Sequence, residues 1–269
     1  MLNREMWDER APAHAASPDY HLAEFLADPT YLSEVVRFDQ PRLGDIAGLD
    51  AIHLQCHIGT DTVSLARLGA RMTGLDFSRP ALEEAQRLAD AAGADIAFVH
   101  GTVEDALQLR ERESFDLVYT GIGALCWLAS IDRWAAVVAG LLRPGGRLFI
   151  REGHPVLWSL ADARGDGLLV IEYPYVELAE GTRFDVDGTY VATDVTFAAR
   201  HTIEFNHGLG EIVTALLDHG MTLTGLVEHD SVPWDALPGL MDPIAGGEFR
   251  LRDRPERLPH SYTLTAVKR

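Results

Sequence analysis

The chain has 269 residues, of which 47% are hydrophobic, so it is long enough to fold around a substantial core as one large α/β domain or two small ones. Its formal net charge of -18 at pH 7 repels polyanions, which argues against nucleic acid or an anionic membrane surface as a partner. No apolar run approaches the roughly 20 residues that span a bilayer. We therefore expect the chain to act on a small molecule or to bind another protein.

The cellular compartment is indicated by the cysteines and by the start of the chain. Cys56 and Cys126 lie inside apolar segments, and the acidic start MLNREMWDER is not followed by the apolar stretch of a secretory signal. We expect a cytoplasmic protein with reduced thiols. The sequence does not decide the oligomeric state, so a homo-oligomer stays open.

The elements predicted along the chain fall into four segments. Residues 1–45 mix aromatic and charged side chains at a spacing that predicts two or three amphipathic helices. Residues 46–155 alternate short apolar runs with helical patterns, which predicts βαβ units and a parallel sheet. Residues 156–205 alternate apolar, glycine and acidic residues, which is typical of antiparallel strands. A helix and two strands in 206–269 are expected to complete the sheet.

Several patterns in the second segment predict particular strands, a helix and a turn. The runs AIHLQC and FDLVYT are nearly continuous in apolar residues, as expected of strands that helices cover on both faces. The helix predicted at 79–92 has Ser78 as its N-cap, Pro80 in its first turn and Gly93 beyond its end. Further on, LLRPGG predicts the end of a helix and a turn into the next strand.

The stretch HLQCHIGTDT at residues 53–62 begins as a strand and ends as a helix, which is how nucleotide cofactors are usually held. A dinucleotide loop needs G-x-G-x-x-G, and Gln55, His57 and Thr60 stand at those glycine positions. A pyrophosphate against this turn is therefore disfavoured. The later GIGALC offers only two glycines and follows the fourth strand, so we treat it as a chance match. A nicotinamide-dependent oxidoreductase or epimerase is kept as an alternative.

A metal or haem site in the same stretch is disfavoured by spacing. On a strand, His53 and His57 lie about 13 Å apart at roughly 3.3 Å per residue, too far to share one ion unless the chain turns sharply. The stretch also lacks the first cysteine of a haem-attachment motif. We expect no metal here.

The acid that a nucleotide site requires is present. TGLDFS places Asp76 at the end of the second predicted strand, about 20 residues beyond the start of the loop, where its carboxylate can accept both hydroxyls of a ribose. A cofactor with an adenosine but no pyrophosphate would fit both Asp76 and the missing glycines.

With these motifs in place, residues 51–154 and the later helix and strands resemble the class I S-adenosylmethionine-dependent methyltransferases. The resemblance rests on HLQCHIG, GLDFS, FVHGTVEDA, FDLVYTGIG and LLRPGG. It implies a Rossmann-like, mostly parallel seven-stranded sheet with helices on both faces, an N-terminal helical lid and an antiparallel β insertion after the fifth strand. It implies S-adenosylmethionine as cofactor, S-adenosylhomocysteine as product, and in-line methyl transfer to O or N of a small-molecule acceptor.

The resemblance also assigns cofactor contacts residue by residue. They are Gln55, His57, Gly59, Thr60, Asp61, Thr62, Asp76, Phe77, Thr102, Val103, Glu104, Thr120 and Gly121. His53 departs from the family, whose acid at that position helps to organise the methionine ammonium. The side chain of Gln55 and the backbone carbonyls of Gln55 and Thr120 are candidates to replace it. The methionine carboxylate would use the helix start at residues 60–62.

A general base is needed only if the acceptor arrives protonated. Candidates are His154 at the end of the fifth strand, His207 before the later helix, and Tyr20 or His14 in the N-terminal segment. For each of them a purely structural role is the competing interpretation. A second alternative for the whole chain is an S-adenosylmethionine-binding protein without turnover. The absence of an Asn/Asp-Pro-Pro-aromatic tetrad after the fourth strand argues further against nucleic acid as substrate.

Overall fold

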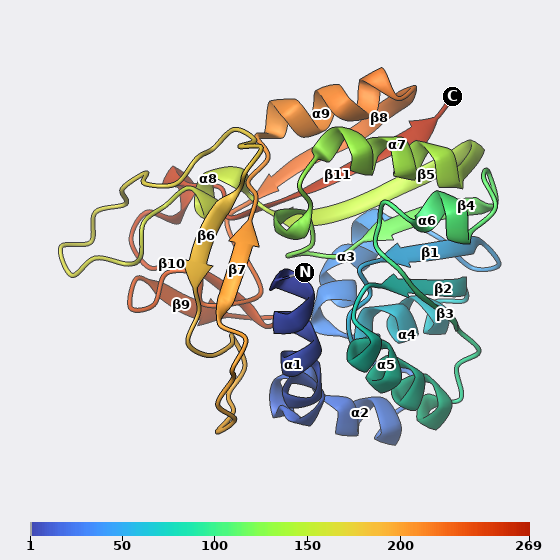
Figure 1. Cartoon of the computed structure of the whole chain (residues 1–269), viewed down its shortest axis with the longest axis horizontal. Coiled ribbons are helices and arrows are strands. Elements are labelled where there is room, and N and C mark those ends of the chain that lie inside the picture. Colours follow the sequence, from blue (N-terminus) through green and yellow to red (C-terminus); the bar gives the residue numbers. More distant parts are fainter. Residues whose placement is uncertain (1) are drawn as a thin grey trace.

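A computed structural model describes residues 2–269 and is built on one central sheet (Figure 1). The strand order is β3-β2-β1-β4-β5-β11-β8, and only β11 runs antiparallel to its neighbours β5 and β8. This confirms the predicted seven-stranded, mostly parallel sheet. The strands of the sheet are β1 (Asp50–Leu54), β2 (Arg71–Asp76), β3 (Ala97–His100), β4 (Phe115–Thr120), β5 (Leu142–Gly153), β8 (Met221–His229) and β11 (Ser261–Lys268).

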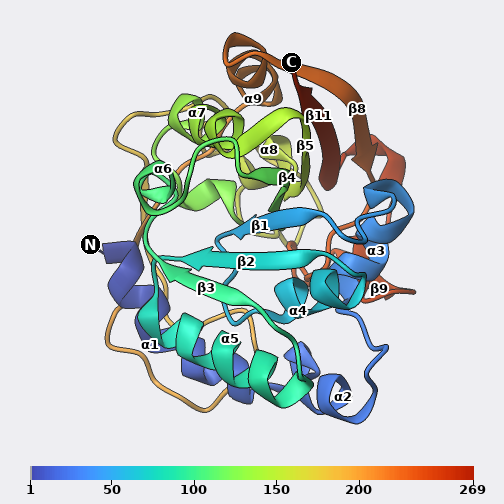
Figure 2. The same ribbon diagram turned by 90° about the vertical axis from the view of Figure 1, so that its right-hand side faces the viewer.

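Helices cover both faces of this sheet (Figure 2). On one face apolar side chains of the strands pack against α2 (Leu22–Ala27), α3 (Glu34–Leu43), α4 (Thr60–Arg67) and α5 (Arg79–Ala92). On the other face they pack against α6 (Ala106–Leu109), α7 (Ile131–Leu141) and α9 (Leu209–Asp218). The nearly continuous apolar runs of the central strands follow from this double coverage.

The boundaries of α5 form as its sequence predicts. The side chain of Ser78 accepts a hydrogen bond from the N–H of Ala81, and Gly93 ends the helix in the left-handed conformation, with φ of 67°. Ser130 caps α7 in the same way, by accepting from the N–H of Arg133. These capping contacts determine where α5 and α7 begin, and Gly93 determines where α5 ends.

The N-terminal helix α1 (Leu2–Ala16) is held by the segment that follows the fifth strand. The Asn3 side chain donates to the carbonyl of Ile203 and accepts from its N–H. Further along α1, Arg10 is buried and donates to the carbonyl of Ala199 at 2.8 Å. Glu9 accepts from the N–H of the same residue. The predicted N-terminal helices and the predicted insertion are therefore joined to each other.

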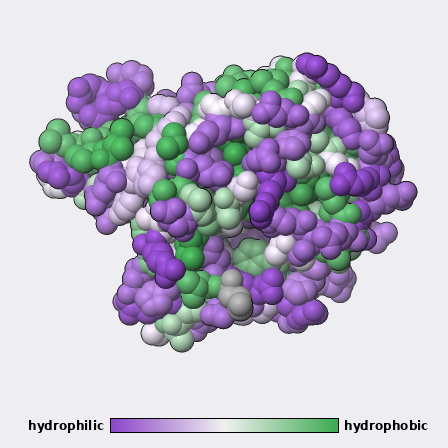
Figure 3. Space-filling model, turned by 45° about the horizontal axis from the view of Figure 1, so that its top comes forward, coloured by the Kyte–Doolittle hydropathy of each residue, from purple (hydrophilic) through white to green (hydrophobic). Residues whose placement is uncertain are grey.

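The insertion is less regular than its sequence pattern indicates. After α8 (Pro155–Trp158), β6 (Thr182–Asp185) and β7 (His201–Glu204) pair as a two-stranded antiparallel sheet, and a single antiparallel bridge joins Leu160 to Ile171. Figure 3 shows apolar side chains gathered on a lobe that projects from the body, where Leu168, Ile171 and Val176 are exposed. The four segment boundaries drawn from the sequence stay a prediction.

The C-terminal part holds a second small sheet that the sequence pattern does not predict. β9 (Met241–Ile244) and β10 (Glu248–Leu251) pair antiparallel, and the 3-10 helix η3 (Pro255–Arg257) leads into β11. Leu251 and Leu258 pack there with Leu157 and Leu160, which follow the fifth strand. Within residues 2–269 no helix is both long and apolar enough to cross a membrane.

Candidate functional site

The turn between β1 and α4 keeps the backbone path of a glycine loop although two large side chains stand in it. Gln55 and His57 have φ of 59° and 49°, and Gly59 has φ of 82°. Left-handed backbone at a residue with a side chain costs on the order of 1–3 kcal/mol, and such strain persists where the surroundings enforce it, typically at functional sites. A Cβ on Gly59 would lie 2.8 Å from the Cβ of Ala85 in α5, so this glycine permits close helix packing.

Asp76, at the end of β2, joins this turn to the next helix. Its Oδ2 accepts a hydrogen bond from the N–H of His57 at 2.8 Å, and its Oδ1 accepts from the N–H of Ser78 at 2.8 Å. The residue is only 6% exposed, and burial raises the pKa of its carboxyl to about 6. Each carboxylate oxygen has a second lone pair, so Asp76 can still accept the hydroxyls of a ribose.

A cavity of about 280 Å³ opens beside this turn at the carboxyl edge of the sheet. It brings together five of the predicted cofactor residues, namely Gln55, Phe77, Thr102, Val103 and Glu104. Other walls come from α1, from the 3-10 helix η2 (Leu125–Trp127) and from the end of the insertion: Leu2, Asn3, Arg4, Trp127, Leu128, Ile203 and Phe205. The lid and the insertion therefore both close over the same space.

The position that holds an acid in the family is neutral here. His53 is 3% exposed, and burial lowers the pKa of its imidazole to about 3. Its Nδ1 lies 2.9 Å from Oγ1 of Thr62, which gives Thr62 a role in orienting the ring. Gln55 donates from Nε2 to the carbonyl of Ala124 at 3.0 Å, whereas its buried Oε1 has no hydrogen-bond partner among residues 2–269. Oγ1 of Thr120 is also buried without a partner in that part of the chain.

Unsatisfied buried acceptors of this kind fit a ligand that carries several donors, because a buried polar group without a partner costs free energy. The methionine end of S-adenosylmethionine carries an ammonium with three N–H donors. The turn after β1 and the acid of β2 thus suit the two ends of that cofactor. Thr60 and Gly121 also lie at this edge, Thr60 as the first residue of α4 and Gly121 directly after β4.

Tyr20, His14 and His57 form one cluster between the lid and the turn. Nδ1 of His14 lies 3.0 Å from Nε2 of His57 and 3.3 Å from the Tyr20 hydroxyl. The Tyr20 hydroxyl also lies within hydrogen-bond distance of the Tyr190 hydroxyl of the insertion. The ring of Trp7 packs edge to face on both histidines.

The protonation states of this cluster follow from burial. Burial lowers the pKa of His14 to about 4 and puts that of His57 well below its usual range, so both rings are neutral near pH 7. Burial and the neighbouring Tyr190 raise the pKa of Tyr20 well above 10. Tyr20 is therefore a hydrogen-bond donor in this state, and the proton acceptors of the cluster are imidazole nitrogens.

His154 and His207 do not join that cluster. His207 is buried, with Nδ1 at 2.9 Å from Oε2 of Glu177 and Nε2 at 2.9 Å from the carbonyl of Leu128. Nδ1 of His154 accepts from the N–H of Val156, and its Nε2 lies 2.9 Å from a carboxylate oxygen of Glu228. Both ring nitrogens of each histidine are thus engaged in supporting the chain, which favours the structural interpretation of both.

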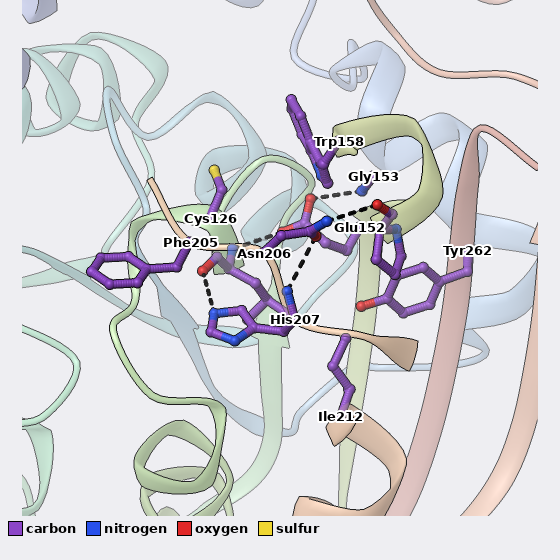
Figure 4. Close-up of a pocket in the computed structure, with 11 residues that line it drawn as sticks. Cys126, Glu152, Gly153, Trp158, Phe205, Asn206, His207, Ile212 and Tyr262 are labelled. Carbon is purple, nitrogen blue, oxygen red and sulfur yellow. Dashed lines mark hydrogen bonds between the residues drawn. The ribbon is translucent and has the colours of Figure 1, made fainter. Parts of the chain in front are cut away.

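Figure 4 shows a second, smaller pocket, in which Glu152, His207 and Tyr262 lie close together. Its volume of about 10 Å³ holds one water molecule at most. Oη of Tyr262 is buried there without a protein partner among residues 2–269. This pocket is too small for an acceptor.

Glu152 is a residue that the sequence analysis missed. Its carboxylate accepts four backbone N–H groups, from Gly123 at 2.6 Å, Ala124 at 2.8 Å, Leu125 at 2.8 Å and Gly153 at 2.7 Å. It therefore shapes the loop after β4 that carries Trp127 into the cofactor cavity. The glutamate in the run REGHP was the available signal, because an acid at the end of a buried strand needs partners.

Among residues 2–269, no group of three or more histidine, cysteine, aspartate or glutamate side chains is arranged to hold a metal ion. His53 and His57 serve different partners, Thr62 for the first and His14 for the second.

Comparisons with known proteins agree with this geometry. A family model described as a methyltransferase domain matches residues 52–148. A ubiquinone biosynthesis O-methyltransferase from Azorhizobium caulinodans is 33% identical over 184 residues, 67% of this chain and 68% of the relative. One from Methylobacterium sp. (strain 4-46) is 33% identical over 137 residues, 51% of this chain and 52% of the relative. The match thus spans about half the length of several such relatives.

Solved structures show the same fold. An S-adenosylmethionine-dependent methyltransferase from Mesorhizobium loti aligns with a TM-score of 0.61 and 22% identity, over 88% of this chain and 98% of that one. A glycopeptide N-methyltransferase solved with S-adenosylmethionine aligns with a TM-score of 0.56 and 17% identity, over 89% and 96% of the two chains. The chain belongs to the class I S-adenosylmethionine-dependent methyltransferases.

Proposed function

We propose that this protein is an enzyme that methylates O or N of a small-molecule acceptor with S-adenosylmethionine as donor. The observation that carries the proposal is the buried Asp76 carboxylate beside the cavity at the carboxyl edge of the sheet, with a turn of glycine-loop conformation next to it. When bound, the cofactor supplies an activated methyl group on its sulfonium. The chain's own residues then have to hold the cofactor, position the acceptor and exclude water.

The nucleoside end of the cofactor would be held by residues at the ends of two strands, β2 and β3. Asp76 would accept the ribose hydroxyls, and Phe77 with residues 102–104 would flank the adenine. Positioning a reactant at near-attack distance contributes about 7–11 kcal/mol to lowering the barrier. The joined lid and insertion support such positioning, because both line the cavity.

The acceptor would lie on the lid side of the turn, against the rings of Trp7 and Trp127, which pack 5.4 Å apart. For an acceptor that arrives protonated, we assign proton uptake to His57, because both ring nitrogens of His14 are engaged, Nδ1 by His57 and Nε2 by Oγ1 of Thr189 at 2.6 Å. The His57 ring is neutral near pH 7 and is a weak base because burial lowers its pKa, whereas the raised pKa of Tyr20 makes that hydroxyl a donor that orients the acceptor. His154 and His207 keep structural roles in this assignment.

The names of the relatives favour oxygen as the methylated atom, since several are ubiquinone biosynthesis O-methyltransferases. Free Cys56 and Cys126 support a reducing, cytoplasmic location. The exposed apolar side chains at 168–176 support self-association through the insertion, which light scattering would measure. The acidic charge supports a small molecule over nucleic acid.

The experiment is an assay for S-adenosylhomocysteine over a panel of phenols, catechols, carboxylates and amines, with mass spectrometry of the product. Acceptor-dependent formation of S-adenosylhomocysteine and a methylated product is expected. Binding of the cofactor without turnover on any acceptor would favour the non-catalytic alternative. Reduction or oxidation of nicotinamide cofactor by the same panel would favour the oxidoreductase alternative.

A further inference from the structure

Asp61, in the first turn of α4, is a carboxylate that forms no ion pair with a cationic side chain among residues 2–269. Burial raises the pKa of its carboxyl, and a hydrogen bond with the Ser33 side chain opposes that increase. Asp61 is partly buried, and a carboxylate withdrawn from water without a counter-cation is costly, so such a group is kept where a ligand completes it. The packing of the chain therefore does not explain why a carboxylate stands at position 61.

The position of Asp61 provides that explanation. A Cβ built on Gly121, directly after β4, would lie 3.5 Å from Oδ2 of Asp61 and 3.3 Å from Nε2 of His53. The carboxylate thus converges with the side chain that stands where the family has its acid. His53 is 3% exposed, and its Nε2 has no hydrogen-bond partner among residues 2–269, since the contact with Thr62 uses Nδ1.

The groups that face this point come from several elements. Burial is the main reason that the pKa values of Tyr20 from η1 (Pro18–Tyr20), Tyr119 from β4 and Tyr190 from the insertion are raised, and the charge of Asp61 adds to each of them, so all three lie within its field. These phenols and the neutral imidazole of His53 bring no positive charge. The remaining nearby acid, Asp39, is bound by the hydroxyl of Tyr119 at 2.6 Å.

We propose that Asp61 replaces the lost acid of the first motif and binds the methionine ammonium of the cofactor, with Nε2 of His53 as a second, neutral acceptor. This rests on the proposed use of S-adenosylmethionine. In the tautomer whose Nδ1 donates to Oγ1 of Thr62, Nε2 of His53 carries the lone pair that an ammonium N–H needs. Asp61 is thereby assigned to the ammonium and not to the methionine carboxylate, which its negative charge would repel.

The test compares two ligands by calorimetry. S-adenosylhomocysteine carries the amino-acid end, whereas 5′-methylthioadenosine is the same nucleoside thioether without it. Asp61→Asn is expected to weaken binding of S-adenosylhomocysteine at least tenfold and to leave the affinity for 5′-methylthioadenosine within about twofold, because only the first ligand carries the ammonium that forms a charge-assisted hydrogen bond with the carboxylate. The exposed Glu83→Gln removes the same charge from α5 and should change neither affinity.

Three results would overturn the proposal: unchanged affinity for S-adenosylhomocysteine, equal weakening of both ligands, or the same effect from Glu83→Gln. Failure of the wild type to bind either ligand would instead overturn the proposed function. The double variant His53→Asp with Asp61→Asn returns a carboxylate to the family's position. It should regain at least half of the lost discrimination between the two ligands, and a double variant no better than Asp61→Asn alone would also contradict the proposal.

Discussion

The backbone N–H of His57 donates to Oδ2 of Asp76 at 2.8 Å, so the turn after β1 is tied to the acid at the end of β2. The same carboxylate accepts from Ser78 through Oδ1. Asp76 therefore supports a turn with left-handed residues, and we propose that its remaining lone pairs accept the ribose hydroxyls of a cofactor in the adjacent cavity, which Phe77 lines.

Replacing Asp76 should separate these roles. Asp76→Ala should weaken S-adenosylhomocysteine at least tenfold, because charge-assisted hydrogen bonds to the ribose are lost. Asp76→Asn keeps one carbonyl oxygen and should fold with a smaller loss of stability than Asp76→Ala. Calorimetry and urea unfolding of both variants check this, and an affinity for S-adenosylhomocysteine that neither variant changes would refute the assignment of Asp76.

Nucleoside binding should depend on pH through the same carboxyl. Burial raises the pKa of Asp76 to about 6, so the group is protonated below that pH and ionised above it. Ribose hydroxyls favour the ionised form, so affinity for 5′-methylthioadenosine should fall as pH drops through about 6, by up to tenfold per pH unit. Calorimetry between about pH 5 and 8 measures the slope. Asp76→Asn should flatten it, and an equal slope in that variant would assign the effect to another group.

The side chain of His57 should matter for the lid more than for the turn. His57→Gly relieves left-handed backbone but removes the ring that contacts His14 and Trp7 of α1. Amide hydrogen exchange of residues 2–16 should therefore become faster, whereas that of β1 and β2 should not. His57→Asn tolerates positive φ and serves as the control for backbone strain. Unchanged protection of α1 in both variants would contradict this role.

Glu152 should stabilise the loop after β4. Glu152→Gln leaves part of its four backbone N–H partners without an acceptor, and a hydrogen bond to a charged group is worth about 1.5–3 kcal/mol. Urea unfolding should show a loss of that size. Glu228→Gln, at a half-exposed carboxylate beside His154, is the matched control and should cost about 1 kcal/mol or less. Equal losses in the two variants would argue against the loop role.

Much of the fold follows from local sequence. The strand runs around His53 and Tyr119, the capping residue Ser78 and the acid Asp76 each act within their own element, and parallel sheets have few alternative arrangements. β6, β7, β9 and β10 are different, because they are short pairs held by contacts with distant segments. Arg10 illustrates this: the buried guanidinium binds carbonyls of the insertion, and nothing near residue 10 in the sequence indicates that.

The candidate site likewise has features that the sequence predicts and features that depend on the fold. The ribose acid could be predicted from its distance along the chain, whereas the convergence of Asp61 with His53 depends on how α4 meets the end of β4. The catalytic candidates show that residue type and position in the sequence do not suffice to identify a general base. His154 and His207 stand at strand and helix ends, as the pattern required, but their nitrogens bind Glu228 and Glu177.

The central claim is that the cavity beside Asp76 binds S-adenosylmethionine, and calorimetry on the wild-type protein tests it most directly. Titration with S-adenosylmethionine, S-adenosylhomocysteine and NAD is the measurement. We expect saturable binding of the first two ligands, competition between them, and no heat from NAD. Tight binding of NAD with no response to either sulfur ligand would contradict it.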